Sequence, residues 1–316
     1  MSDELPGNLR PVADFFGLPG TAPVAKDFHV VRAIRVLAAL DAAPFALVFG
    51  GGTALARAHR LVRRMSEDVD FKIVPLPAAP VSRSGLHRQR SALRGRVTAA
   101  LQAAGFIFDP KDPAQTRSRD ESSYMVWHLP YSPPAGAGEG LRPTIKVELN
   151  FAPLRRPTVT LAVASFVAEA MNRPPEVPTL ACVGVIETAA EKLVALTRKT
   201  AMDLAGASRD PDPALVRHIY DLHMMREHLD TAVVVALARD IAAADALEFR
   251  NQYPAYAADQ AGETRKALDA LRADPLHRRR YTRFMADMVY GERPEFDEAF
   301  ATVAGLAGVA WRWWGA

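Results

Sequence analysis

The sequence of 316 residues has little cysteine, no long apolar run and no strong excess of charge. Its one cysteine, Cys182, cannot form an internal disulfide or a thiolate zinc site, and its apolar neighbours predict a buried small side chain. No run of about 18 apolar residues is present, which excludes a transmembrane helix. The formal net charge of +3 is compatible with a nucleic-acid partner but does not require one.

The N-terminus also lacks the charged region and apolar core of a secretory signal. We therefore expect a cytoplasmic protein without membrane contacts. Hydrophobic residues make up 49% of the chain and charged residues 24%. This balance is sufficient for a packed core and excludes global disorder.

Hydrophobic periodicity predicts an α+β chain in two parts. Residues 1–25 are rich in Pro and Gly and predict an irregular lead-in. Residues 26–160 combine helical segments with short strands, which predicts a domain with a mixed sheet flanked by helices. Ala- and Leu-rich helical segments dominate residues 161–316, so we expect a C-terminal helical domain and place the boundary near residues 155–165.

A glycine turn stands out between a strand and a helix. The apolar residues 45–49 end in three glycines and Thr53, and residues 53–62 predict a helix. Glycines allow a backbone to approach a phosphate closely, and the first turn of a helix offers unpaired N–H groups to it. A turn required only for tight packing explains the glycines equally well. The turn is not a P-loop, because no Gly-Lys-Ser/Thr follows it.

Two aspartates begin the next predicted strand, residues 68–74. Asp68 and Asp70 are two residues apart and therefore point to the same face of that strand. Adjacent carboxylates repel each other unless a cation lies between them, and Mg²⁺ is a hard cation that binds carboxylates and phosphates together. Solvated surface acids are the alternative. The preceding strand, glycine turn and helix favour the metal site.

Two segments resemble one known family. The sequences GGTAL at residues 51–55 and RMSEDVDF at residues 64–71 resemble the signature of AbiEii/AbiGii toxins, which include the MenT-type toxins. That family belongs to the DNA polymerase β-like nucleotidyltransferase superfamily. The resemblance implies nucleotide binding by Gly51, Gly52, Thr53 and Ser66, and binding of two Mg²⁺ ions by Asp68 and Asp70.

A third carboxylate is predicted on a strand over residues 144–151. The residues alternate between apolar and polar, which places Glu148 on the same face as Lys146 and Asn150. The superfamily carries a third acid on a neighbouring strand, so Glu148 could complete the metal site or accept the proton of an attacking hydroxyl. An exposed strand glutamate is the alternative.

Two helical segments further along also resemble family motifs. Lys192, in the sequence EKLVAL, carries over as the lysine that binds the triphosphate, since an ammonium is a compact charge for phosphate oxygens. In the sequence RHIYDL, Asp221 carries over, whereas His218 stands where an acid is common. Asp221 could pair with Arg217 four residues before it, or it could orient Lys192.

The acceptor of the nucleotide is predicted from clustered arginines. Arginines contact phosphate backbones, and Tyr281 beside them could stack on an exposed base. Solvated helix faces explain the clusters equally well. The resemblance implies that some family members modify the 3′ end of tRNA and that a separate antitoxin neutralises the toxin. The candidate tRNA-binding residues are Arg83, Arg88, Arg90, Arg94, Arg278, Arg279 and Arg280.

Together these features predict a Mg²⁺-dependent nucleotidyltransferase toxin of a type IV toxin–antitoxin system. It would transfer NMP from an NTP to an acceptor, most simply the 3′ end of tRNA, and release pyrophosphate. The predicted catalytic residues are Asp68, Asp70, Glu148, Lys192 and Asp221. The alternatives are transfer to a protein or small molecule, and a non-catalytic module that binds nucleotide or RNA.

Overall fold

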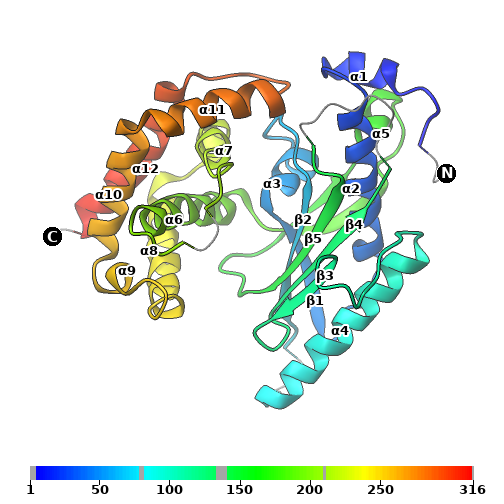
Figure 1. Cartoon of the computed structure of the whole chain (residues 1–316), viewed down its shortest axis with the longest axis horizontal. Helices are drawn as coiled ribbons and strands as arrows, with labels where there is room; N and C mark the ends of the chain where they lie inside the picture. Colours follow the sequence, from blue (N-terminus) through cyan, green and yellow to red (C-terminus); the bar gives the residue numbers. More distant parts are fainter. Residues whose placement is uncertain (1–4, 78–81, 133–140, 209–210, 315–316) are drawn as a thin grey trace. The chain divides into compact units, whose positions relative to one another are not determined.

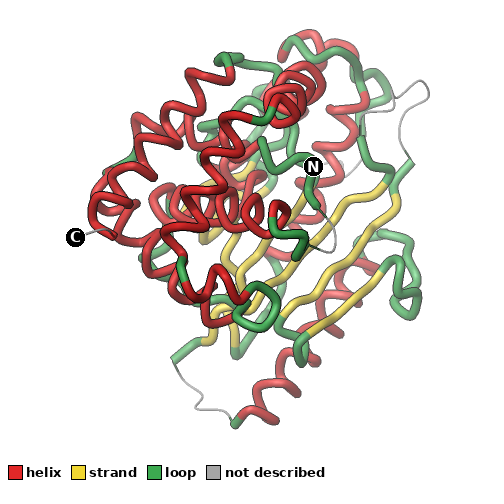
Figure 2. The backbone as a smooth tube through the Cα atoms, turned by 60° about the vertical axis from the view of Figure 1, so that its left-hand side comes forward, coloured by secondary structure: helices red, strands yellow, loops and turns green. Residues whose placement is uncertain are grey.

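The structure is a computed structural model that describes residues 5–77, 82–132, 141–208 and 211–314, with the backbone alone at 311–314. The chain forms two compact units, Met1–Val183 and Gly184–Ala316 (Figure 1). Unit 1 contains the β-sheet, and unit 2 is built from helices (Figure 2). None of the described helices is long and apolar enough to cross a bilayer. The predicted mixed sheet followed by a helical part is confirmed.

The sheet of unit 1 has seven strands among the described residues, in the order β3-β4-β5-β2-β1-β7-β6. The pairs β2–β5 and β1–β7 are parallel, and the other pairs are antiparallel. The strands that carry the predicted carboxylates, β2 and β5, are direct neighbours in this order. The bounds are β1 Phe45–Gly50, β2 Asp68–Pro75, β3 Thr116–Arg119, β4 Tyr124–Pro130, β5 Thr144–Phe151, β6 Val159–Val163 and β7 Val177–Cys182.

Helices α2 (Ala22–Ala38) and α4 (Arg83–Ala103) pack on the same face of the sheet (Figure 1). Side chains alternate between the two faces of a strand, and in β2 and β5 every second residue is buried. These apolar residues share one core with both helices, so the polar residues between them lie on the opposite face. The core includes Val30, Ile34, Leu37, Val69, Phe71, Ile73, Leu93, Val97, Leu101, Ile145, Val147 and Leu149.

The prediction of an irregular lead-in over residues 1–25 is wrong for much of its length. Helix α1 spans Arg10–Phe16, and α2 already begins at Ala22. Each helix has a proline in its first turn, where the missing N–H costs no hydrogen bond. Gly17 ends α1 with φ of 64°, a conformation that suits glycine. The prolines and the glycine therefore mark helix ends in this segment.

Unit 1 extends to Val183, beyond the boundary that we place near residues 155–165. Strands β6 and β7, with the short helix α5 (Phe166–Ala170) between them, complete the sheet next to β1. Composition alone does not separate these short elements from the helices that follow. Cys182 lies in β7 and is fully buried, as its apolar neighbours predict.

The helix that we predict over residues 53–62 is shorter and irregular. Helix α3 (Gly51–Thr53) continues as a single π-helical segment, Ala54–Ala58 (η1). The π segment carries Arg57, which is 4% exposed. The Arg57 guanidinium lies 3.2 Å from a carboxylate oxygen of Asp27 and 3.8 Å from the ring centre of Phe166. A buried ion pair therefore joins this segment to α2.

Unit 2 consists of seven α-helices and one short 3₁₀ segment, η2, within the described residues. Helix α6 packs against α8 and α10, and α12 packs against α7 and α8. The bounds are α6 Val185–Leu204, α7 Arg217–Met225, η2 Arg226–His228, α8 Thr231–Glu248, α9 Pro254–Ala258, α10 Gln260–Ala273, α11 Pro275–Met288 and α12 Phe296–Trp314.

Candidate active site

The glycine turn lies directly against the start of β2. Gly51 has φ of 71°, which glycine adopts at little cost. A Cβ atom at Gly51 would collide with the Asp70 carboxylate, and one at Gly52 would collide with the Arg64 guanidinium. Both glycines therefore have a packing role. The same close approach places the turn backbone beside a predicted metal ligand.

Thr53 and Ser66 fix the start of β2 to the glycine turn. The buried Thr53 hydroxyl donates a hydrogen bond to the carbonyl oxygen of Asp68. The hydroxyl oxygens of Thr53 and Ser66 are 2.8 Å apart. In the structure both hydroxyls thus contact protein groups. Their predicted role in binding nucleotide phosphates is not tested by these contacts and stays a prediction.

The three predicted carboxylates lie on one face of two neighbouring strands. Asp68 and Asp70 are half-buried, whereas Val69 between them is fully buried on the opposite face. In the parallel pairing of β2 and β5, Asp70 is opposite Glu148 and Asp68 is opposite Lys146. The alternation in the sequence thus leads to a row of Asp68, Asp70 and Glu148 that we call the carboxylate row.

Arg142 is the first cation on the carboxylate row, and no pattern in the sequence marks it. Its Nη2 atom lies 2.7 Å from an oxygen of Asp68, and its backbone N–H donates to Glu67 over 2.8 Å. Lys26, which is fully buried, donates to the carbonyl oxygens of Arg142 and Thr144, each over 2.6 Å. Lys26 also lies 3.0 Å from Glu67. The segment that carries Arg142 is therefore fixed by hydrogen bonds from Lys26 and to Glu67.

Lys146 is the second cation on the row, and it forms a salt bridge with Glu148. Partial burial disfavours its charged form, but the Glu148 carboxylate more than offsets this and raises the pKa of Lys146 to about 12. Lys146 is therefore charged at all physiological pH values. The strand alternation already placed it beside Glu148, so the signal for this contact was present in the sequence.

The carboxylate row has the donor chemistry that Mg²⁺ requires, since all three side chains offer hard oxygen ligands. Among the described residues, no group of three or more acids, histidines or cysteines is drawn together as a ready-made metal cage. Arg142 forms an ion pair with Asp68, and Lys146 forms one with Glu148. The three side chains offer ligands of the kind that Mg²⁺ uses, and their predicted role in metal binding stays a prediction.

Lys192 and Asp221 form a buried ion pair in unit 2. Lys192 Nζ on α6 lies 2.8 Å from a carboxylate oxygen of Asp221 on α7, and both side chains are almost fully buried. Arg217, the other partner considered for Asp221, lies 3.2 Å from Asp212. Of the two arrangements predicted for Asp221, the structure contains the pair with Lys192. Their predicted part in catalysis is a separate matter and stays a prediction.

His218 is a second neighbour of the Lys192 ammonium. The His218 Nδ1 atom lies 3.3 Å from Lys192 Nζ, and the residue is buried. Burial, together with the charge of Lys192, holds the pKa of His218 well below its usual value. The ring is therefore neutral and accepts a hydrogen bond from the ammonium. At the position where the resemblance implies an acid, this chain has a neutral acceptor.

The arginines of α4 differ in their availability for nucleic acid. Arg83 forms a salt bridge of 2.8 Å with Glu121. Arg90 is buried, lies 4.9 Å from the ring centre of Phe151, and is unavailable to a phosphate backbone. Arg88 is exposed and Arg94 is half-buried. Arg90 is therefore removed from the predicted RNA contacts, because its guanidinium is buried over the Phe151 ring.

The arginines of α11 also separate into engaged and available residues. Arg278 makes two hydrogen bonds to Asp297, of 2.6 and 2.9 Å. Arg279 is exposed and Arg280 is half-buried. Tyr281 is 2% exposed and donates to the Pro294 carbonyl over 3.0 Å. The prediction that Tyr281 stacks on an exposed base is wrong, because its ring is part of the core.

Comparison with known proteins identifies the family of this chain. The family model described as "Nucleotidyl transferase AbiEii toxin, Type IV TA system" matches residues 35–302. The chain belongs to the AbiEii family. As a member, it is a nucleotidyltransferase of a toxin family from type IV toxin–antitoxin systems. The resemblance seen in the two sequence motifs is thereby confirmed, and the match includes both units.

The solved structures that are similar to this AbiEii family member include another nucleotidyltransferase toxin. It is MenT4, a nucleotidyltransferase toxin from Mycobacterium tuberculosis H37Rv, with 18% sequence identity and a TM-score of 0.47. The similarity covers 96% of this chain and 99% of the MenT4 chain. No curated protein matches the sequence.

Proposed function

We propose that the chain transfers a nucleoside monophosphate from an NTP to the 3′ end of tRNA. The observation that carries this proposal is the carboxylate row, Asp68, Asp70 and Glu148, placed directly beside the glycine turn. Arg142 and Lys146 offset the repulsion at Asp68 and Glu148, but a row of acids still repels phosphate unless a metal ion lies between them. A protein that only bound phosphate would gain nothing from it. We therefore favour transfer over a binding module.

In the proposed reaction the oxygen of the acceptor 3′-hydroxyl attacks the α-phosphorus of the NTP. A new phosphodiester bond forms, the bond between the α- and β-phosphates breaks, and pyrophosphate leaves with the bonding electron pair. The hydroxyl proton passes to a carboxylate, for which Glu148 is our candidate. Mg²⁺ bound to Asp68, Asp70 and Glu148 would supply Lewis-acid stabilisation of the phosphate oxygens.

The remaining proposed roles concern phosphate binding. Gly51 and Gly52 would let the turn backbone approach the triphosphate, and Thr53 and Ser66 would offer their hydroxyls. Lys192 would bind the terminal phosphates, with Asp221 holding its ammonium in place. This role requires Lys192 to share its charge between Asp221 and phosphate. The neutral His218 leaves more of that charge available than a second acid would.

The acceptor is proposed from the arginines that remain available. Arg88 and Arg279 are exposed, and Arg94 and Arg280 are half-buried. Arginines of this kind contact an RNA backbone through its phosphates without reading sequence. We propose these four residues as tRNA contacts. A cognate antitoxin, a cytoplasmic location and the dependence on Mg²⁺ belong to the same proposal.

One labelling experiment tests the proposal. The purified chain is incubated with each α-³²P-labelled NTP, Mg²⁺, total tRNA and total cell protein, and the products are separated by size. Label at the 3′ end of tRNA is expected, and Asp70→Asn should abolish it. Label in protein or a small molecule would replace tRNA as the acceptor. Absence of any label, with NTP still bound, would support the non-catalytic module.

A matched control separates loss of chemistry from loss of structure. Asp269→Asn removes an exposed aspartate on α10, far in sequence from the carboxylate row. It should transfer label at the wild-type rate. Equal loss in Asp269→Asn and Asp70→Asn would show that the assay responds to general damage, and the assignment of the row would fall.

A further inference from the structure

The polar face of the sheet, which carries the carboxylate row, extends over β4 to β3 at the edge of the sheet. Residues that are paired directly across two antiparallel strands lie on the same face. Arg117 on β3 is paired with Val126 on β4, and Val126 is paired with Glu148. Glu148 is in turn paired with Asp70. One line of residues across the sheet therefore joins Arg117 at the edge to the carboxylate row.

A second line of residues runs beside the first. Arg119 is paired with Tyr124, and Tyr124 is paired with Asn150. The Tyr124 hydroxyl donates a hydrogen bond to the Glu148 carboxylate, and the Tyr124 ring centre lies 6.0 Å from the Arg119 guanidinium. Neighbouring strands are about 4.8 Å apart, so the backbone of β3 lies about 10 Å from that of β5. Arg117 and Arg119, which we call the β3 arginines, are therefore two strand spacings from Glu148.

The opposite face of β3 and β4 belongs to the core. Trp127 on β4 is fully buried, and its Nε1 atom donates to the Thr98 hydroxyl on α4 over 3.0 Å. Thr116 on β3, which is paired with Trp127, is also buried. Because side chains alternate along a strand, the β3 arginines point away from α4.

The β3 arginines also differ from other arginines in their partners. Arg83 and Arg278 form ion pairs with acids. Arg117 and Arg119 are both exposed, and within the described part of the chain no acid lies within ion-pair distance of either guanidinium. Their charge is therefore available to a partner from solution.

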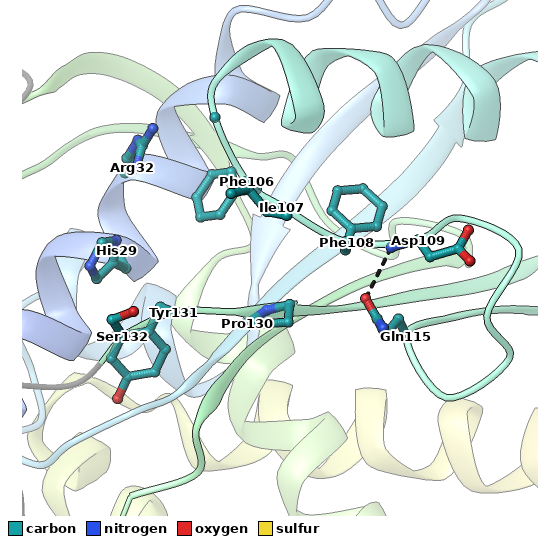
Figure 3. Close-up of a pocket in the computed structure, with 11 residues that line it drawn as sticks. His29, Arg32, Phe106, Ile107, Phe108, Asp109, Gln115, Pro130, Tyr131 and Ser132 are labelled. Atoms are coloured by element: carbon teal, nitrogen blue, oxygen red, sulfur yellow. Dashed lines mark hydrogen bonds between the residues drawn. The ribbon is translucent and has the colours of Figure 1, made fainter.

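Both ends of β3 are fixed by neighbouring segments. In the turn after β3, the Glu121 carboxylate forms a salt bridge of 2.8 Å with Arg83 of α4. Just before β3, the side-chain oxygen of Gln115 accepts the backbone N–H of Asp109 over 3.0 Å (Figure 3). The backbone carbonyl of Gln115 accepts the N–H of His128 over 2.7 Å. The β3–β4 hairpin therefore presents the β3 arginines at a defined place on the sheet.

The surroundings of His128 show the sign of the charge between β3 and the row. Burial lowers the pKa of His128 below its usual value, and the charges of three cations lower it further. These cations are Lys146, Arg117 and Arg142, and the Asp68 carboxylate opposes them. A neutral histidine thus lies among positive charges, in a place that attracts phosphate.

The carboxylate row separates the β3 arginines from the glycine turn. The strand order is β3-β4-β5-β2-β1, and the row lies on β5 and β2. The glycine turn follows β1, and Gly51 in this turn lies against the Asp70 carboxylate. An NTP at the turn would therefore occupy one side of the row and leave the side of β4 and β3 to an acceptor.

We propose that the β3 arginines bind the phosphates at the single-stranded 3′ end of an RNA acceptor and guide its terminal hydroxyl to the carboxylate row. This path rests on the proposed transfer to tRNA. An acidic row repels the phosphates of an incoming strand, so a strand that reaches the row requires cations nearby. A guanidinium binds two phosphate oxygens at once and reads no sequence. Arg88 and Arg94 lie on α4, behind the sheet from the row, and would contact RNA farther from the 3′ end.

The binding test uses the full chain in EDTA, so that no transfer takes place, and a twelve-nucleotide single-stranded RNA with fluorescein at its 5′ end. Fluorescence anisotropy gives the Kd at several salt concentrations. The double variant Arg117→Gln, Arg119→Gln should weaken binding about tenfold or more, since two charge-assisted contacts are lost. The slope of log Kd against log salt should fall by about 1.4, about 0.7 for each lost phosphate contact.

Matched variants separate this contact from a general charge effect and from misfolding. Arg10→Gln, Arg173→Gln removes two exposed arginines of unit 1 that lie outside both lines, and it should keep the wild-type slope. Arg117→Lys, Arg119→Lys keeps both charges and should retain the slope with a smaller loss of affinity. In label transfer, the double glutamine variant should raise the KM for tRNA about tenfold and leave kcat within about twofold of the wild type, because the row is intact.

An unchanged slope in the double glutamine variant, or an equal loss in the Arg10 and Arg173 control, would overturn the proposal. So would the absence of RNA binding by the wild type up to about 100 µM at low salt. A photoreactive thiouridine at the second nucleotide from the 3′ end should crosslink to the β3–β4 hairpin, and crosslinks only to α4 or α11 would contradict the path. RNA binding that depends on the β3 arginines, without any label in tRNA, would uphold the contact and remove the transfer reaction. Label in tRNA with an unchanged KM in the double glutamine variant would do the reverse.

Discussion

The carboxylate row of unit 1 and the Lys192–Asp221 pair of unit 2 use the same kinds of charge in opposite surroundings. The side chains of Asp68 and Glu148 are about one quarter exposed, at 25% and 23%. Those of Lys192 and Asp221 are 8% and 0% exposed. Water screens the row, whereas the buried pair is screened much less.

This difference teaches what each region is able to do. Charges in the row can exchange partners, since the released groups are solvated at modest cost. Charges in the buried pair cannot separate cheaply, because each would be left without compensation in a poorly solvated place. The row therefore suits a site that takes up and releases ions and nucleotides. The pair suits a lysine that is held at a fixed position.

The largest expected effect comes from removing one charge of the row. Asp70→Asn should lower label transfer roughly a thousandfold, the equivalent of several kcal/mol of metal-assisted stabilisation. Its melting temperature should stay near that of the wild type, since the side chain is half-buried and the amide has nearly the same size as the carboxylate. Initial rates and thermal unfolding measure the two properties. A folded variant with full activity would remove Asp70 from the site.

Removing one charge of the buried Lys192–Asp221 pair should lower both the activity and the stability of the fold. Asp221→Leu leaves the Lys192 ammonium without its carboxylate and should lower the free energy of unfolding by about 3–5 kcal/mol. The double variant Lys192→Met, Asp221→Leu should regain much of this stability and stay inactive. Urea denaturation followed by circular dichroism gives the values. If the double variant is no more stable than Asp221→Leu, the cost does not come from the unpaired ammonium.

Unit 1 also contains a buried carboxylate, Asp27, which can be compared with the partly exposed acids of the carboxylate row. Burial raises the pKa of Asp27 from 3.8 to about 6, although Arg57 partly offsets the effect. The folded state then binds the proton more tightly than the unfolded chain. This contribution to stability is fully present below about pH 4 and is lost as the pH rises through about 6. The loss amounts to about 3 kcal/mol at most.

Asp27→Asn tests this dependence, because the amide does not titrate. The unfolding free energies of both proteins are measured by urea denaturation between about pH 4 and 7, a range set by the two pKa values. The wild type should lose stability relative to Asp27→Asn as the pH rises. Parallel curves would show that Asp27 has an ordinary pKa in the fold.

Local patterns made the carboxylate row predictable. A period of two residues places Asp68 and Asp70 on one face, and the same period over residues 144–151 places Glu148 on its strand. That strand, β5, has the bounds predicted for it. For Asp221 we predicted two partners, namely Arg217 from helical spacing and Lys192 from the family resemblance, and the structure contains the pair with Lys192. The face on which each carboxylate lies follows from local spacing, whereas the neighbourhood of Glu148 to the two aspartates and the pairing of Lys192 with Asp221 came from the family resemblance.

The missed features depend on contacts between distant residues. Arg142 reaches Asp68 from 74 residues away, and no local pattern marks such a contact. Arg90 was predicted to contact tRNA, but its guanidinium is buried over the ring of Phe151. Helix α1 and the first turn of α2 were missed because prolines in a first turn and a closing glycine look the same in irregular segments. Tertiary packing decides these cases.

Arg142→Gln tests whether the carboxylate row binds a metal ion in place of the Arg142 guanidinium. Without the guanidinium, binding of a metal ion to Asp68 no longer requires its salt bridge with Arg142 to break. The affinity for Mn²⁺, used as a probe of the Mg²⁺ site, should increase about tenfold, a change of about 1.4 kcal/mol. Electron paramagnetic resonance counts free Mn²⁺, with Arg88→Gln as the control. Weaker binding would mean that Arg142 supports the metal ligands.

The smallest expected effect concerns His218, the neutral neighbour of the buried pair. His218→Gln keeps an acceptor for the Lys192 ammonium and should leave the KM for NTP within about twofold of the wild type. His218→Leu removes the acceptor, worth about 1 kcal/mol, and should raise this KM about fivefold with less change in kcat. Steady-state label transfer at varied NTP separates the two constants.

Because burial holds the pKa of His218 well below 6.5, all three proteins should share the same pH profile between about pH 6 and 8. A step near pH 6.5 that disappears in His218→Gln would show that the ring titrates, and that the surroundings of Lys192 are less fixed than its burial indicates.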